Sequence, residues 1–221
     1  MVTTNKGKNE ASVILFLLKP GVSATELERF VKSKNGDPNA ATKYGSIVFD
    51  VEAKPGKASE VQTNLAPGEY FALLAPAQGP PKFHTGFTVT TAQSPATLPK
   101  PQATIRSIEF DFRGPTTLRD GELVRFKNEG YLVHMDVAFP VKSERAAKEA
   151  AHALLTGRTK GLGRLIAGSP ISFAGPLSHG AFQQETITAK PGWYVQACFM
   201  ETQEGESHTR LGMERIFRIT K

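Results

Sequence analysis

Residues 191–213 read Pro-Gly-Trp-Tyr-Val-Gln-Ala-Cys-Phe-Met-Glu-Thr-Gln-Glu-Gly-Glu-Ser-His-Thr-Arg-Leu-Gly-Met. After the turn at Pro191-Gly192, the aromatic and branched residues of 193–199 predict a β-strand that contains Cys198, the only cysteine of the chain. A polar loop leads to His208, and Met213 follows after four more residues. A thiol, an imidazole and a thioether in this order are donors that suit a soft metal ion.

A second segment supplies another imidazole. Asn128-Glu-Gly130-Tyr-Leu-Val-His134 is an Asn-x-Gly turn that leads into a predicted strand, residues 133–141. Together the two segments resemble the cupredoxin (blue copper) family, in which a tyrosine lies four residues before the cysteine. In that family a loop, a histidine, four residues and a methionine follow.

The resemblance implies a copper site. His134, Cys198 and His208 would be the equatorial ligands, Met213 the weak axial ligand, and Asn128 would steady the ligand loop by hydrogen bonds. The cofactor would be one type 1 copper ion, because two imidazoles and a thiolate in a trigonal plane accept both Cu(I) and Cu(II). The loop of nine residues between Cys198 and His208 is longer than in the smallest family members.

The chain also resembles itself at an offset of 123 to 124 residues. Asn5 then falls on Asn128, Tyr70 on Tyr194 and His84 on His208, in an ordered series with one small gap. We therefore expect two cupredoxin-like units, residues 1–93 and 103–221, joined by a proline-containing linker at 94–102.

The expected fold is all-β, with two cupredoxin-like Greek-key β-sandwiches and one inserted helix in each. In the second unit short runs at 105–112, 122–127, 133–141, 169–173, 183–188, 193–199 and 213–219 predict strands. Ser143 begins a predicted helix that ends near Leu155, and Ser23 with Glu26 has capping-box spacing for a helix over 23–31. The first unit has no counterpart of the leading strands, so either the chain is truncated or another segment completes that sandwich.

The first unit is predicted to hold no copper. Leu74 stands at the position of Cys198, Ala11 at or next to that of His134, and the Arg-Leu-Gly-Met stretch has no counterpart. His84 remains opposite His208 and is interpreted as a structural relic.

Charge and composition exclude several classes of protein. The net charge of +6 comes from scattered basic residues, so no nucleic-acid patch is indicated. The chain contains no run of about 18 apolar residues, so no transmembrane helix is predicted. The short apolar run at 13–18 is predicted to be a buried strand. No signal peptide, Ser-His-Asp set, CxxC motif or nucleotide fingerprint is evident, and Gly161-Leu-Gly163 is better read as a turn.

Three functions remain open. The leading hypothesis is a non-enzymatic copper protein that transfers electrons or handles copper, with a redox protein or a copper donor or acceptor as its partner. The resemblance implies a periplasmic or extracellular location. A multicopper oxidoreductase is an alternative, but the chain has five histidines and no His-x-His pair. A copper-free β-sandwich interaction module is the third. His152 and His179 are interpreted as surface and turn residues.

Overall fold

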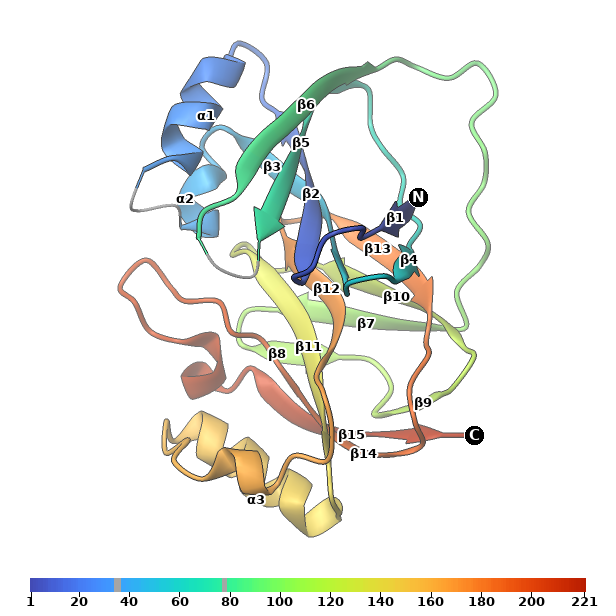
Figure 1. Cartoon of the computed structure of the whole chain (residues 1–221), viewed down its shortest axis with the longest axis vertical. Coiled ribbons are helices and arrows are strands. Elements are labelled where there is room, and N and C mark those ends of the chain that lie inside the picture. The colour runs from blue at the N-terminus through green and yellow to red at the C-terminus, as the bar shows by residue number, and fades with distance from the viewer. Residues whose placement is uncertain (34–36, 77–78) are drawn as a thin grey trace.

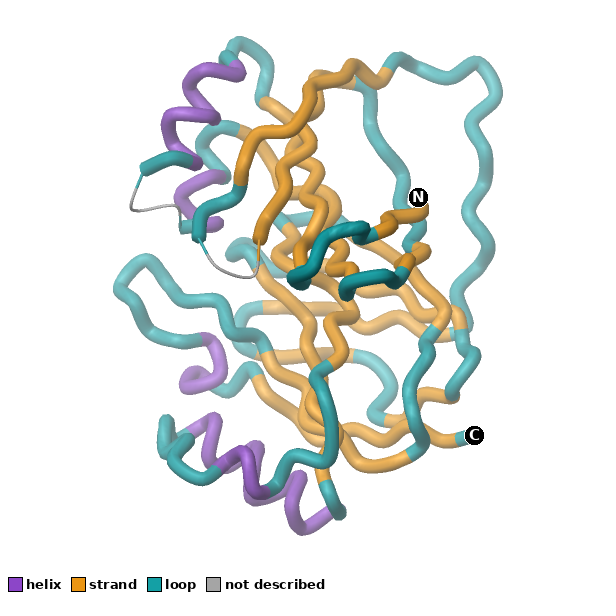
Figure 2. The backbone as a smooth tube through the Cα atoms, in the orientation of Figure 1, coloured by secondary structure: helices purple, strands orange, loops and turns teal. Residues whose placement is uncertain are grey.

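The computed structural model describes residues 1–33, 37–76 and 79–221. Two β-rich units lie one above the other, the first in blue to green and the second in yellow-green to red (Figure 1). The helices gather along one side of the molecule, and residues 90–102 run without regular structure along the opposite side (Figure 2). No described helix has both the length and the apolar composition needed to cross a bilayer.

The second unit is a sandwich of two sheets. One sheet has the strand order β13-β10-β7-β8, built from Phe182–Thr186, Leu123–Asn128, Ala103–Ile108 and Asp111–Arg113. The other has the order β12-β11-β14-β15-β9, built from Ile171–Leu177, His134–Val141, Gly192–Ala197, Glu214–Thr220 and Thr117–Arg119. Aromatic residues fill the space between the sheets, where Phe126 stacks on Phe173 at 5.0 Å between ring centroids.

The first unit has the strand order β3-β2-β5-β6, built from Gly45–Ala53, Ala11–Leu18, Gly68–Pro76 and Lys82–Val89. Its second layer is the two-stranded ribbon β1-β4, Val2–Thr4 with Ala58–Glu60. Just beyond β4, the N–H groups of Gln62 and Gln184 each donate to the other residue's carbonyl at 2.8 Å. The ribbon therefore continues onto strand β13 of the second unit.

Matching polar contacts recur in the two units. The amide side chains of Asn5 and Asn128 each donate to the carbonyl four residues on and to a carbonyl of β3 or β12. Each also accepts the N–H of the glycine two residues on. The hydroxyls of Tyr70 and Tyr194 each donate to the carbonyl four residues earlier. These bonds fix the same turns in both units.

The helices begin where the predicted caps lie. Helix α1, Ala24–Val31, is capped by Ser23 with both capping-box bonds present, and α3, Glu144–Leu155, is capped by Ser143. The first unit contains one more helix than expected: α2, Pro38–Ala41, which is capped by Asp37. Two 3₁₀ turns, η1 (Leu162–Arg164) and η2 (His208–Leu211), complete the second unit.

The predicted strand over residues 105–112 is wrong in its second half. Strand β7 ends at Ile108, Glu109 and Phe110 form a turn, and β8 runs back antiparallel from Asp111. Phe110 adopts a left-handed conformation with φ of 59°. Because β-branched and aromatic residues flank this turn on both sides, composition alone does not reveal the reversal.

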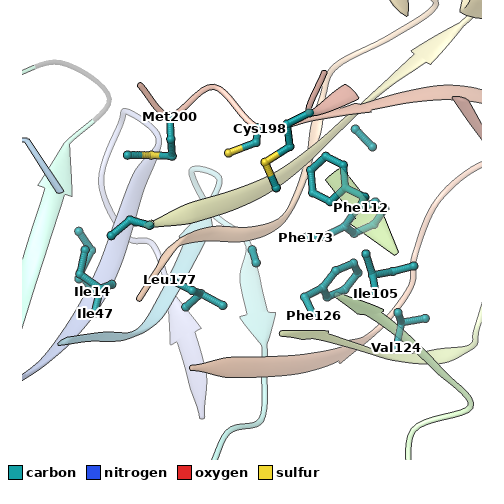
Figure 3. Close-up of a cluster of buried hydrophobic side chains, with 14 of the residues drawn as sticks. Ile14, Ile47, Ile105, Phe112, Val124, Phe126, Phe173, Leu177, Cys198 and Met200 are labelled. Atoms are coloured by element: carbon teal, nitrogen blue, oxygen red, sulfur yellow. The ribbon is translucent and has the colours of Figure 1, made fainter. Parts of the chain in front are cut away.

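The two units share one hydrophobic core. Ile14 and Ile47 of the first unit belong to the same buried cluster as Phe126, Phe173 and Cys198 of the second (Figure 3). Strand β3 lies against β12 at this boundary, where the Ser178 hydroxyl accepts the Ile47 N–H and the Ser178 N–H donates to the Ile47 carbonyl, both at 2.9 Å. A continuous apolar core ties the position of one unit to the other.

Candidate metal centre

Three of the predicted ligands lie at the ends of regular elements. His134 is the first residue of β11, Cys198 follows directly after β14, and His208 is the first residue of η2. Since β11 and β14 are paired neighbours, the start of one and the end of the other meet at the same edge of the sheet.

A small hairpin returns the long loop to the site. The Thr202 N–H donates to the Glu206 carbonyl at 2.8 Å, and Glu201 forms a β-bridge with Ser207. The His208 N–H then donates to the Met200 carbonyl at 2.9 Å, which brings His208 back beside Cys198. The nine-residue loop is therefore compatible with a closed ligand set.

The three donor atoms converge. The Cys198 sulfur lies 3.8 Å from Nδ1 of His134 and 3.5 Å from Nδ1 of His208. All three ligand atoms lie within 4.8 Å of one another, and the three side chains are buried. For bond lengths of about 2.0 Å to nitrogen and about 2.3 Å to sulfur, a trigonal metal site would separate N from S by about 3.7 Å. The observed separations fit such an ion.

Met213 is tied to this set through its backbone. Its N–H donates to the His208 carbonyl at 2.9 Å, and its carbonyl accepts the Cys198 N–H at 3.2 Å. Gly212, with φ of 106°, makes the left-handed turn between η2 and β15. The Met213 side chain is fully buried in the same core cluster as Cys198.

Burial sets the charge of the donors. It raises the pKa of the Cys198 thiol to about 12, and burial together with the neighbouring His208 lowers the pKa of His134 to about 4. Burial also lowers the pKa of His208. Both imidazoles are therefore neutral, as metal binding requires, whereas a cation would have to displace the thiol proton.

Asn128 holds the segment before His134. Its amide donates to the carbonyls of Leu132 and Leu177, both at 2.7 Å, and accepts the Gly130 N–H at 2.8 Å. Leu177 is paired with His134 across β12 and β11. The side chain thus fixes the turn that delivers the first imidazole.

Two residues beside the histidines were not predicted from the sequence. Glu109 accepts the N–H groups of Tyr131 and Leu132, and its Oε1 lies 3.8 Å from Nε2 of His134. Phe110 packs edge-on against the His208 ring, with 5.2 Å between centroids. Both lie in the turn that sequence analysis assigned to a strand. A left-handed residue beside a candidate site is a recognised signal, but only the backbone reveals it.

The other three histidines are not part of this donor group, although Nδ1 of His179 lies 2.8 Å from the Gly130 carbonyl in the turn before His134. His84, His152 and His179 are exposed, and Leu74 lies on β5 in the first unit. Among the residues that the structure describes, the group of His134, Cys198 and His208 is the only one with three donors of these types close together.

Several solved structures of copper proteins are similar to this chain at low sequence identity. Auracyanin B is 17% identical over 57% of this chain and 94% of its own, with a TM-score of 0.34. Auracyanin A, a "blue" copper protein from Chloroflexus aurantiacus, is 24% identical over 53% of this chain and 96% of its own, with a TM-score of 0.31. A Cu-containing nitrite reductase from Thermus scotoductus is 13% identical over 100% of this chain and 56% of its own, with a TM-score of 0.32.

No protein-family model and no curated protein sequence matches the chain. The structural similarities combine low identity with low TM-scores, so the assignment of the site depends on its own geometry and donor chemistry.

Proposed function

We propose that the second unit binds one type 1 copper ion and that the protein is a non-enzymatic electron carrier. His134, Cys198 and His208 would hold the ion, with the Met213 thioether as a further weak ligand. The observation that supports this most directly is that the Cys198 sulfur lies 3.5–3.8 Å from Nδ1 of both histidines and that all three side chains are buried. A bound copper ion would supply one-electron exchange between Cu(II) and Cu(I).

The burial of the donors favours electron transfer over copper delivery. His134, Cys198 and His208 are each at most 1% exposed, so no incoming protein could replace one of them without opening the core. An electron needs no such opening. The surface near the site also offers apolar contact, because Tyr131, Phe199 and Leu211 are all markedly exposed.

The fold holds the donors in a way that favours a small rearrangement energy on electron transfer. His134 begins β11, His208 begins η2, and backbone bonds link His208 to Met200 and Met213. A ligand set that is held in place by the fold need not move when the ion changes its oxidation state. The role of these residues is to hold, orient and dehydrate the ion.

We further propose that the two units are copies of one ancestral unit, with boundaries at residues 1–93 and 103–221. The matching strand orders and the matching bonds of Asn5 and Asn128 support this. The first unit would then be a scaffold without copper, and the whole protein would function outside the cytoplasm, as the resemblance to cupredoxins implies.

The test is reconstitution with Cu(II). The protein should take up one copper per chain and develop an intense visible thiolate-to-copper band. Cys198→Ser should lose the band, whereas His84→Ala, the matched histidine of the first unit, should keep it. An absent band in the wild-type protein would contradict the proposal, and a stoichiometry of two or more would favour the multicopper alternative.

A further inference from the structure

A residue of the first unit contacts two segments beside the candidate metal centre. Asn39 lies on helix α2 of the first unit and is only 4% exposed. Its Oδ1 accepts the Val133 N–H at 2.7 Å, and its Nδ2 donates to the Glu201 carbonyl at 2.9 Å. One side chain therefore joins two segments of the second unit that are distant in sequence.

Both segments carry ligands. Val133 directly precedes His134, and Glu201 lies three residues after Cys198, in the loop that leads to His208. The Asn39 amide thus bridges the start of β11 and the start of the ligand loop.

One of these segments carries an N–H group that faces the sulfur. The Met135 N–H donates to the Cys198 sulfur at 3.3 Å, and Val133 lies two residues before Met135. Hydrogen bonds to the cysteine sulfur tune the reduction potential of a His₂Cys copper site. A shift of the segment that Asn39 holds at Val133 would change this bond.

Helix α2 holds Asn39 independently of the ligand segments. Asp37 accepts the N–H groups of Asn39 and Ala40, at 2.9 and 3.3 Å, and the Thr42 hydroxyl donates to the Asn39 carbonyl at 2.6 Å. The amide is therefore presented from a fixed backbone. Another contact between the units involves neither ligand-bearing segment: the Thr63 hydroxyl donates to the Phe182 carbonyl on β13.

We propose that Asn39 is a positioning residue through which the first unit holds the two ligand-bearing segments, and that it thereby sets the copper affinity and reduction potential of the second unit. This inference rests on the proposed copper function. It gives the first unit a defined role, because a scaffold that only buried apolar surface would not need a polar side chain at this point.

The experiment compares three variants of the full-length chain. Asn39→Ala removes both bonds, Asn39→Asp keeps an oxygen for the Val133 N–H but removes the donor to Glu201, and Thr63→Val removes an inter-unit bond that touches no ligand segment. Copper affinity is measured by competition with a chelator, the reduction potential by redox titration of the visible band, and the mobility of residues 199–207 by hydrogen exchange of the copper-free protein.

We expect Asn39→Ala to weaken copper binding by about 10-fold or more, as loss of an outer contact to a metal ligand does elsewhere. We also expect a lower potential, because weaker N–H···S bonds leave more electron density on the sulfur, and faster exchange in 199–207. Asn39→Asp loses the bond to Glu201 and should therefore also show faster hydrogen exchange in residues 199–207. This variant still tests the inference if the alanine variant does not fold. Thr63→Val should change none of the three quantities.

Equal behaviour of the Asn39 and Thr63 variants in all three measurements would overturn the inference. If the wild-type protein binds no copper, the proposed function fails by itself. Hydrogen exchange in the copper-free chain then still decides whether Asn39 holds the ligand loop.

Discussion

Replacing Asp50 by asparagine should make the free energy of unfolding less dependent on pH. Asp50 lies on β3 at the boundary between the units, where it is 4% exposed and its Oδ1 has no hydrogen-bond partner among the described residues. It sits so close to Gly175 of β12 that a Cβ atom there would lie 2.6 Å from the carboxyl oxygens. Burial raises the pKa of Asp50 to about 8, against a smaller lowering by the Ser12 hydroxyl.

The direction in which stability changes with pH follows from the pKa of Asp50 in the folded and in the unfolded chain. The folded protein keeps the Asp50 proton up to a pH of about 8, whereas the unfolded chain loses it near pH 4. Between these limits the folded state binds more protons, so the free energy of unfolding falls as the pH rises. The slope for one such group is about 1.4 kcal/mol per pH unit, or on the order of 2–3 kcal/mol between pH 5 and pH 7.

The assay is urea unfolding at several pH values between 5 and 8, followed by the fluorescence of Trp193, the only tryptophan. Asparagine cannot ionise, so the variant should lose stability less steeply than the wild type over this range. Asp111→Asn, at an exposed carboxylate on β8, serves as the control. Other buried carboxyls, such as Glu185, contribute equally to both proteins and cancel in the comparison. Parallel curves for wild type and Asp50→Asn would refute the reasoning.

Further predictions concern the metal centre and the turns. A Cβ atom at Gly130 would lie 2.7 Å from Nε2 of His134, so Gly130→Ala should weaken copper binding by about 10- to 100-fold in a chelator competition. Gly163→Ala, where nothing lies within 4 Å, should leave the affinity unchanged. Tyr194→Phe and Tyr70→Phe each lose a hydrogen bond to a backbone carbonyl, and urea unfolding should show a cost of about 1 kcal/mol for each. Copper binding at neutral pH should release about one proton per ion, because the ligand thiol is protonated before the ion binds. Calorimetry in buffers of different ionisation enthalpy measures the number of protons released, and a value near zero would contradict this prediction.

Local features of this protein could be predicted from the sequence because their causes are local. The caps at Ser23 and Ser143 begin helices as expected, since a hydroxyl and the nearby N–H groups belong to the same turn. The strand before Cys198 follows from its branched and aromatic residues. The resemblance to cupredoxins singled out His134, Cys198 and His208, and the structure brings these three donors together.

Only the tertiary structure decided what brings distant segments together. Nothing near Asn39 in the sequence indicates that its amide bridges Val133 and Glu201, because both partners lie in the other unit. The Gln62–Gln184 bridge, which joins the first ribbon to β13, likewise has no local signal. Such contacts depend on how two units share one core, and hydrogen-bond partners across that core are selected by packing rather than by sequence spacing.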